Sequence, residues 1–507
     1  MKQWKKVLFF VFLVSAGLGY SISSQALQLD WNGQFWFDNH WLNNYQLQRS
    51  RPGFDDDTWL RNRGGTYVRG TGEKNVVWYS AFFRLKPTVV VNDSIQIKSE
   101  FHIGSPIYGF LGRGYPTTVD ERFNITGAQK ENFAIGAQRY WLNLITDFGT
   151  IELGRAPVHW GLGAIWNSGD KLFDHYQNTG DMIRLISKFG NFYIAPSLVK
   201  VAVGNNLAGA TDAAGNTING NDDVTDYDIA AKYDNTEEDF DFGVKWTHRV
   251  GNASQRTILF SPNQVGSRRI SFNIFDFYAK KKLGLYTFGG EVPLFSGSIG
   301  ALDGANEFEY KTVAFVMEGT YTSDMWDIGL KFGHVPGQPP TSVGDRKFRA
   351  VYLNKNYGLG LIMFHYNIYG LANNNPDTLP AGADLNSPFD APIVNARYAA
   401  LTPEMKLDKW TLKAAFIIGY ADEKAQATKR FYNYNQRRFF DADQNQSSFL
   451  GKEFDLGASF RWDENFLATW DFGLWLPGSY YKFSNDAGLP IDADMMFASQ
   501  VRVGVTF

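Results

Sequence analysis

The sequence predicts an all-β protein, a transmembrane antiparallel up-and-down β-barrel. Apolar and polar residues alternate in segments of about ten residues, as in strands with one face toward lipid and the other toward a lumen. The mean hydropathy of the chain is mildly negative, at −0.29. After the N-terminal segment, no apolar run reaches the roughly 20 residues that a spanning helix needs. Such a chain can cross a bilayer only as a closed sheet, because closure pairs every backbone group.

The N-terminal segment has the three parts of a secretory signal peptide. They are a basic start, an apolar run and a small-x-small cleavage position: Lys2, Lys5 and Lys6; residues 7–19; and Ser24-Gln25-Ala26. A retained membrane anchor is the alternative, but the apolar run is too short to cross a bilayer comfortably. We therefore expect residues 1–26 to be cleaved on export and residues 27–507 to form a single barrel domain.

The composition excludes several classes of function. The chain has 49 Lys and Arg against 52 Asp and Glu, so no basic excess points to nucleic acid as a partner. It has no cysteine, which excludes thiol catalysis and cysteine-ligated metal sites. Aromatic residues make up 16% of the chain, and there are 50 glycines. Both are expected where aromatic girdles surround a barrel and glycines ease strand curvature.

The expected strands are clearest where alternation is strict. These segments are 95–103, 226–233, 240–247, 326–333 and 454–462. Alternation is less regular over 269–281 and 285–297, where Phe275 and Phe277 blur the pattern. A soluble β-sandwich also alternates, but it does not require an export signal and aromatic strand ends together.

Short turns and long polar stretches connect these strands in alternation. Short turns are expected at 92–93, 148–149, 190–191, 235–238, 282–284, 323–324, 356–358, 408–409 and 463–465. Long loops are expected at about 39–75, 105–132, 158–180, 204–224, 251–268, 298–308, 336–344, 371–392, 422–450 and 479–493. This asymmetry is typical of outer-membrane barrels, and it gives about 20 strands, with 18 as the alternative count. A first strand near Leu29 and a last strand ending at Phe507 could pair and close the sheet.

The chain ends in an amphipathic strand with a terminal aromatic residue. Val501, Val503, Val505 and Phe507 share one parity. This ending resembles the C-terminal assembly signal of Gram-negative outer-membrane β-barrels. The resemblance implies localisation in the outer membrane, contact with its lipid and lipopolysaccharide, and delivery by periplasmic chaperones to the barrel assembly machinery. A homo-oligomer is compatible with it.

The third long loop is the candidate constriction. It follows the strand end Gly154-Arg155 and begins with Trp160-Gly161-Leu162-Gly163. Here the chain resembles a porin, since general porins carry a Gly-Arg strand end before an inward-folded third loop. More loosely, it resembles uncharacterised barrels with a Gly-Arg, a Trp-Gly-x-Gly and a Gly-Asp element. The two glycines would let the loop bend against the wall.

Charged and aromatic residues around this loop are the candidate constriction residues: Arg139, Arg155, His159, Trp160, Asp170, Asp181 and Arg184. They could set the size and field of a pore. Alternatively, Trp160 closes the barrel mouth and the charges are solvated. Arg155 shares its parity with Ile151 and Leu153, so a lumenal Arg155 requires a bulge near Gly154.

Further charges are expected to line the lumen: Arg84, Lys98, Glu100, Lys245, Lys331, Lys413, Arg461 and Arg502. Their signs are mixed with a basic excess, which favours a modest anion preference. At about 20 strands the lumen would exceed what side chains fill, so loops must narrow it.

No arrangement of residues points to an enzyme or a cofactor. The only local cluster, His159, Asp170, Asp174 and His175, lacks a nucleophile at a suitable spacing. Acidic segments at 219–223 and 441–445 space their carboxylates as calcium loops do, but neither matches an EF-hand. We therefore predict no enzymatic activity, no cofactor and no dedicated metal site.

The sequence thus predicts a porin-like outer-membrane channel for passive diffusion of small hydrophilic solutes, narrowed by an inward-folded third loop (158–180). The alternative is a surface structural or recognition barrel with a closed lumen. A transporter for hydrophobic compounds is less favoured, because the inward parity is polar.

Overall fold

The computed structural model describes residues 28–44, 75–104, 135–202, 224–251, 270–301, 307–366, 391–434, 438–483 and 493–507. The expected signal peptide, most of the first, second, fourth and fifth expected long loops, much of the stretches 371–392 and 479–493, and the acidic segment 219–223 lie outside these ranges. Within them, no helix is long and apolar enough to cross a membrane.

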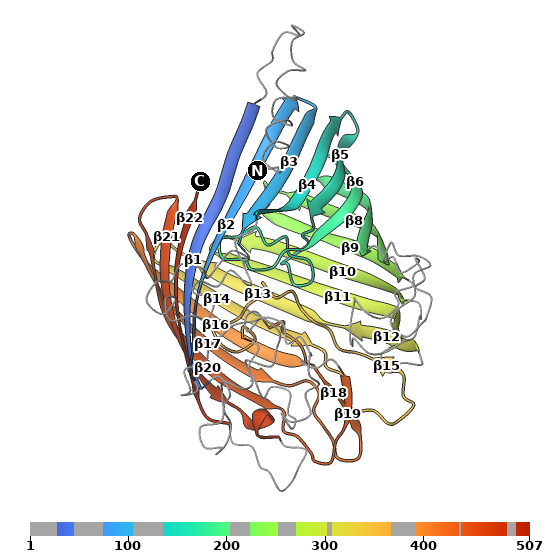
Figure 1. Ribbon diagram of the computed structural model, residues 1–507, viewed down its shortest axis with the longest axis vertical. Coiled ribbons are helices and arrows are strands. Elements are labelled where there is room, and N and C mark those ends of the chain that lie inside the picture. The colour runs from blue at the N-terminus through green and yellow to red at the C-terminus, as the bar shows by residue number, and fades with distance from the viewer. Residues whose placement is uncertain are drawn as a thin grey trace, which may run out of the picture.

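Most of the described strands form one sheet that closes on itself, and its long strands are all antiparallel to their neighbours (Figure 1). Its first half consists of β1 (Gln28–Asn43), β2 (Asn75–Asn92), β3 (Ile95–Ile103), β4 (Ile135–Thr146), β5 (Gly149–Pro157), β6 (Thr179–Phe189), β7 (Phe192–Ala202), β8 (Val224–Asn235) and β9 (Phe240–Gly251). The second half consists of β10 (Ile270–Leu283), β11 (Tyr286–Ala301), β12 (Glu307–Val313), β13 (Phe315–Thr322), β14 (Trp326–Val335), β16 (Ala396–Leu407), β17 (Trp410–Tyr420), β20 (Phe449–Arg461), β21 (Phe466–Pro477) and β22 (Met496–Thr506). The first and last strands pair, with Phe35 opposite Val505, so the expected closure is confirmed.

The barrel proper has 18 strands. The sheet contains 20 segments, but β12 and β13 are halves of one strand that both pair with β11. A further segment, β15 (Lys347–Phe348), adds only two residues beside β12. Two further elements are not part of the barrel sheet: a hairpin of β18 (Arg430–Asn433) and β19 (Arg438–Asp441), and a 3₁₀ helix, η3 (Ser479–Lys482). The all-β barrel with short turns at one end is thus confirmed, with the alternative strand count.

One expected turn is wrong. Residues 356–358 do not connect two barrel strands, because β14, which precedes them, pairs directly with β16, which follows them. Instead, apolar residues on both sides of this expected turn, among them Val351 and Ile362, are buried. The spacing of these apolar residues reflects packing inside the barrel and not contact with lipid. The pattern was therefore misinterpreted as two strands joined by a turn.

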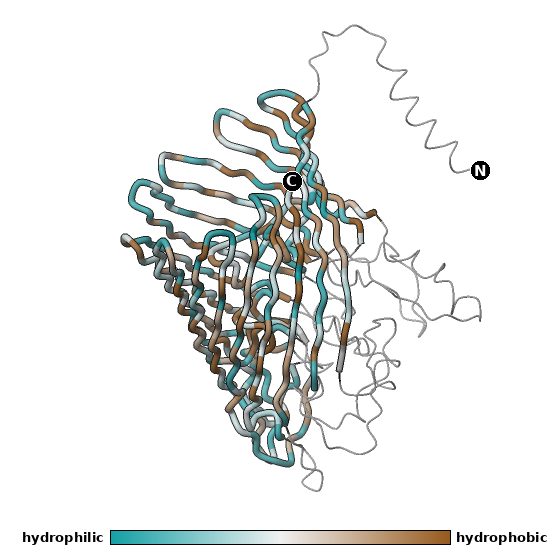
Figure 2. Tube along the Cα trace, turned by 90° about the vertical axis from the view of Figure 1, so that its left-hand side faces the viewer, coloured by the Kyte–Doolittle hydropathy of each residue, from teal (hydrophilic) through white to brown (hydrophobic). Residues whose placement is uncertain are grey.

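The two faces of the strands differ as alternation predicts. On β20, Phe454 and Leu456 are 45% and 65% exposed on the outer face, whereas Glu453 on the inner face of the same strand is fully buried. Figure 2 shows the resulting alternation of hydrophilic and hydrophobic residues along the strands. On β10 the inner face is also apolar: Ile274 belongs to the same buried cluster as Trp160 of the third loop. This inner packing explains why alternation is blurred there.

Candidate functional site

Two loop segments contact the inner face of the barrel. We call residues 158–178, between β5 and β6, the third-loop segment, and residues 336–366, after β14, the seventh-loop segment. The third-loop segment turns sharply at its start, where Gly161 and Gly163 have φ of +58° and +80°. These left-handed conformations favour glycine.

The third-loop segment is attached to β10 and β11. The Glu291 carboxylate accepts hydrogen bonds from the backbone N–H groups of Leu162 (2.6 Å), Ala164 (3.3 Å) and Ile165 (3.2 Å). The Trp160 indole donates to the backbone carbonyl of Asp276 at 3.1 Å. A buried turn would otherwise leave these N–H groups unpaired, so a fully buried acid on the wall is the matching acceptor.

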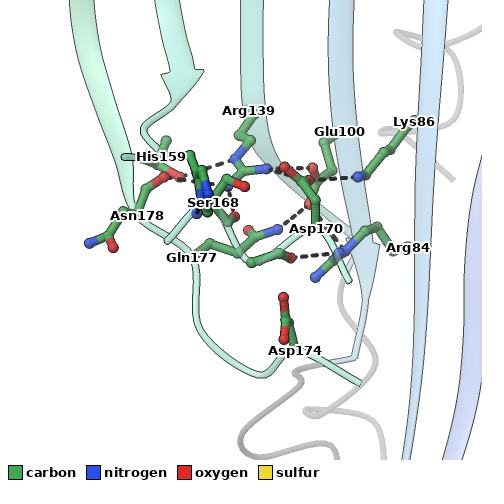
Figure 3. Close-up of polar contacts among 12 residues, drawn as sticks. Arg84, Lys86, Glu100, Arg139, His159, Ser168, Asp170, Asp174, Gln177 and Asn178 are labelled. Atoms are coloured by element: carbon green, nitrogen blue, oxygen red, sulfur yellow. Dashed lines mark hydrogen bonds and ion pairs between the residues drawn. The ribbon is translucent and has the colours of Figure 1, made fainter. Parts of the chain in front are cut away.

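The same segment is attached to β2, β3 and β4 by charged side chains (Figure 3). Arg139, which is 1% exposed, contacts Asp170 and Glu100 at 3.1 Å each and donates to the Ser168 carbonyl. The Lys86 ammonium lies 2.7 Å from Asp170. This group of contacts is centred on Asp170, which is held by two cations.

Arg84 and Glu100 complete this network. Arg84 donates to the Gly169 carbonyl at 2.8 Å and lies 3.3 Å from Glu100. Glu100 also accepts a hydrogen bond from Gln177 at 2.6 Å and contacts His102 at the same distance. Three wall cations (Arg84, Lys86 and Arg139) therefore meet two carboxylates, which leaves a local positive excess.

The ionisation of the loop carboxylates follows from these contacts. Burial alone would raise the pKa of Asp170, but the hydrogen bond and charge of Lys86, helped by Arg139, hold that pKa below its ordinary value of 3.8. For Asp174, burial outweighs the hydrogen bond from the Lys171 N–H and the charges of Lys171 and Arg84, so its pKa lies above the ordinary value. Burial also lowers the pKa of His159, whose ring Nδ1 accepts from the Ser168 N–H at 3.4 Å.

At its far end the third-loop segment contacts β1 and β22. Phe173 lies against Arg502, whose guanidinium carbon is 4.7 Å from the ring centroid. Its ring also meets Trp36 edge-on at 6.2 Å, and His175 lies 3.3 Å from Asp38. One short segment thus contacts inward-facing residues of strands on different sides of the barrel.

The seventh-loop segment is attached to β20 in a similar way. The Glu453 carboxylate accepts from the N–H groups of Ile362 (2.6 Å) and Met363 (2.5 Å), and Asp455 accepts from that of Leu361 (2.9 Å). A cavity of about 270 Å³ lies between this segment and the inner faces of β16, β17 and β20–β22. Its charged lining includes Glu404, Lys413, Asp455, Asp471 and Arg502.

The two segments also contact each other. The Asn354 amide donates to the Asn178 side-chain oxygen at 2.6 Å, and the Asn354 N–H donates to the Ala164 carbonyl at 2.6 Å. Asn356 and Tyr176 exchange two hydrogen bonds, at 2.7 and 3.2 Å. These contacts join loops more than 170 positions apart in sequence, with separations of 176 and 180 positions.

Among the candidate constriction residues, the structure brings together Arg139 and Asp170, and His159 and Trp160 belong to the same loop segment as Asp170. Arg184 lies elsewhere on the inner face and donates to Glu152 at 2.6 Å. Arg84 and Glu100, expected only as lumen lining, belong to the central network.

The expected position of Arg155 and Asp181 is wrong. The two side chains pair with each other at 2.6 Å and are 42% and 43% exposed. The register of β4 and β5 runs without a shift and places Arg155 opposite the outward-facing Tyr140. Without a bulge, the parity of Arg155 remains that of the outer wall.

Most of the expected lining residues have ion partners on neighbouring strands. Lys245 lies 2.6 Å from Asp228, Lys331 3.1 Å from Glu318 and Arg502 3.2 Å from Asp471. Lys98 and Arg461 share the inward parity of Glu100 and Glu453, and Lys413 lines the cavity. Neighbouring opposite charges therefore cancel along much of the wall.

The roles of Glu291 and Glu453 and the inward position of the seventh-loop segment were not predicted from the sequence. A signal was present, because Tyr357-Gly358-Leu359-Gly360 repeats the aromatic-Gly-Leu-Gly order of the third loop. The cluster of His159, Asp170, Asp174 and His175 is not assembled as a unit: Asp170 contacts Arg139, and His175 contacts Asp38. No group of three or more candidate metal ligands occurs among the described residues, and Asp441 pairs in register with Arg430.

Comparisons with known proteins found no matching family model and no similar curated protein. Among solved structures, the chain is similar to OccK9 (OpdG) of Pseudomonas aeruginosa, at 11% identity over 94% of this chain and 99% of that chain, with a TM-score of 0.45. It is similar to OpdK of the same organism with vanillate (10% identity, 94% and 98% covered, TM-score 0.46). It is also similar to a BenF-like porin from Pseudomonas fluorescens Pf-5 (10% identity, 95% and 98% covered, TM-score 0.46). The fold assignment rests on the strand pairing of the chain itself.

Proposed function

We propose that this protein is a porin-like channel of a Gram-negative outer membrane, through which small hydrophilic solutes diffuse passively. The observation that carries this proposal is the attachment of the third-loop segment to β11 on one side and to β2–β4 on the other. A barrel of 16–18 strands leaves an aqueous lumen, and a loop held across it sets the size limit.

The charged network supports a role in ion selection. Arg84, Lys86 and Arg139 outnumber Glu100 and Asp170, so anions are favoured modestly at this point. Charged linings of this kind select ions in wide pores. Further along the wall, ion pairs such as Lys245–Asp228 keep the surface hydrated without a strong net field.

The outer face supports the membrane location. Its large apolar residues, such as Phe332 and Leu456, are exposed at 41% and 65%, as expected for contact with lipid. Phe507, which follows the last strand directly, is 49% exposed, and the barrel assembly machinery would recognise it after delivery by periplasmic chaperones. We propose that outer-membrane lipid and lipopolysaccharide surround the barrel and that residues 1–26 are cleaved on export. Assembly as a homo-oligomer is compatible with this location.

The test is single-channel recording of the refolded mature chain in planar bilayers, with reversal potentials in a salt gradient. We expect stable conductance steps with slight anion preference, which Arg139→Met reduces because it removes a cation from the network. Arg155→Met is the matched control, since Arg155 lies on the outer wall and its loss should leave selectivity unchanged.

The contact between the two loop segments favours one alternative, a surface recognition barrel with a closed lumen. Asn354 bonds to Asn178 and Ala164, so the two segments together fill part of the interior. A folded, heat-modifiable barrel that shows no conductance would favour this alternative over the channel.

A further inference from the structure

A short sequence occurs twice in the chain, once in each inner segment. Residues 160–166 read Trp-Gly-Leu-Gly-Ala-Ile-Trp, and residues 357–363 read Tyr-Gly-Leu-Gly-Leu-Ile-Met. The first position is aromatic in both copies, and the next three and the sixth are identical. The two copies lie in loops that are far apart in sequence but touch each other in the structure.

Both copies present the same backbone groups to the wall. In the first copy, the N–H groups at the fifth and sixth positions, Ala164 and Ile165, donate to Glu291. In the second copy, the equivalent N–H groups, those of Leu361 and Ile362, donate to Asp455 at 2.9 Å and to Glu453 at 2.6 Å. Equivalent positions of the repeat thus dock on inward-facing carboxylates.

The two glutamates are chemically matched to this task. Glu291 and Glu453 are both 0% exposed, and a buried carboxylate requires several hydrogen-bond donors. Each glutamate accepts hydrogen bonds from at least two backbone N–H groups of the loop segment that is docked on it. The wall strands differ, since Glu291 lies on β11 and Glu453 on β20.

Glycine is required where each copy meets its glutamate. A Cβ atom on Gly161, the second position of the first copy, would lie 2.6 Å from a Glu291 carboxylate oxygen, and one on Gly360, the fourth position of the second copy, would lie 2.7 Å from a Glu453 oxygen. The backbones are not identical, because the first copy uses left-handed glycines and the second does not. What the two copies share is the docking chemistry.

We infer that Glu291 and Glu453 are positioning residues of a two-part constriction. Glu291 on β11 holds the first copy of the repeated element against the wall, and Glu453 on β20 holds the second. The two parts meet where Asn354 contacts Asn178. This inference rests on the proposed channel function for its effect on conductance. The docking itself is independent of that function.

The cysteine-free chain allows a direct test of docking. Ala164→Cys and Met363→Cys, at positions 0% and 1% exposed, report on the first and second copy through their rate of labelling by a small maleimide. Glu291→Ala should speed labelling at position 164 by about tenfold or more, since loss of the hydrogen bonds that hold this copy favours local opening. Position 363 should change much less. Glu453→Ala should speed labelling at position 363 and change position 164 much less.

Conservative variants and a control separate docking from general damage. Glu291→Gln and Glu453→Gln keep one acceptor oxygen, so they should label at intermediate rates. Asp327→Ala removes a partly exposed acid that pairs with Lys406, and it should change neither rate. Heat-modifiable mobility establishes that each variant is a folded barrel. Two results would overturn the inference. One is an unchanged labelling rate in both alanine variants, and the other is an equal increase in labelling at positions 164 and 363 in either variant.

Conductance of the same proteins tests the two-part constriction. We expect both alanine variants to conduct more than the parent chain, whichever copy is released. Altered labelling with unaltered conductance in either variant would overturn the two-part constriction while docking stands. If the parent itself is silent, the channel proposal fails, and the labelling pattern still decides whether the glutamates position the two copies.

Discussion

Gly33 in the first strand and Phe507 at the end of the chain exchange two backbone hydrogen bonds. The Gly33 N–H donates to the Phe507 carbonyl at 2.8 Å, and the Phe507 N–H donates to the Gly33 carbonyl at 3.1 Å. The Phe507 ring stacks on Phe83 with a centroid distance of 5.9 Å. The terminal residue is therefore part of the seam that closes the barrel.

Gly33→Val should destabilise this seam. A Cβ atom there would lie 2.5 Å from the Arg84 carbonyl and 2.7 Å from the Phe507 ring. Forced overpacking of this kind costs about 1–3 kcal/mol. The loss would appear as a lower urea midpoint of the heat-modifiable band. Gly290→Ala, where the nearest atom is 3.7 Å away, serves as the control and should leave the midpoint unchanged.

Arg139→Met should cost about 3 kcal/mol, because it leaves the buried Glu100 without one of its cations. Arg139 and Glu100 are 1% and 2% exposed. The double variant Arg139→Met with Glu100→Gln should be less destabilised than the single one, since no charge is then left unpaired. Arg155→Met breaks an ion pair of half-exposed residues and should cost less than about 1 kcal/mol. Equal costs for the two single variants would contradict this expectation.

Asp170→Asn should lower stability at neutral pH but not in acid. The folded-state pKa of Asp170 lies below its ordinary value of 3.8, so the unfolded chain binds more protons between these two values. The contribution of Asp170 is therefore complete above 3.8 and is lost as the pH falls through the folded-state pKa. Urea midpoints of parent and variant, measured from neutral pH downward, should converge in acid.

Asp174→Asn serves as a control, because it should change stability at neutral pH in the direction opposite to Asp170→Asn. Burial raises the pKa of Asp174, so its ionised form is disfavoured in the folded protein at neutral pH. The asparagine variant should be the more stable protein at neutral pH, and its advantage should shrink as acid protonates the parent. A parallel response of the two aspartate variants would show that the local charges do not act as described.

Asn178 and Asn354 should be energetically coupled. Their side chains share a hydrogen bond of 2.6 Å between the two segments. A double-mutant cycle with alanine at each position should give a coupling of about 1 kcal/mol. Each asparagine also accepts one backbone N–H, Asn178 from Asn167 at 2.7 Å and Asn354 from Asn356 at 2.9 Å, so the two single variants should cost similar amounts. Strict additivity in urea unfolding would show that the two segments are held separately.

Much of the barrel could be predicted because strand faces are a local property. Leu330 and Phe332 are exposed on the outer face, and Lys331 between them faces Glu318 inside, as alternation implies. The parity of Arg155 also predicted an outer position correctly, and only the assumed bulge misplaced it. The same local rule failed around 356–358, where the flanking apolar residues, such as Leu353 and Ile362, are buried inside the barrel.

The sequence by itself determined the fold class, the two faces of the strands and the pairing of the chain ends, since period-two alternation and the terminal strand depend on neighbouring residues. Only the tertiary structure decided which loops enter the barrel and which wall residues receive them. Glu291 and Leu162 are 129 positions apart, and Asn354 and Asn178 are 176 apart. No local pattern encodes such pairs, because they form only after closure brings opposite walls around the same interior.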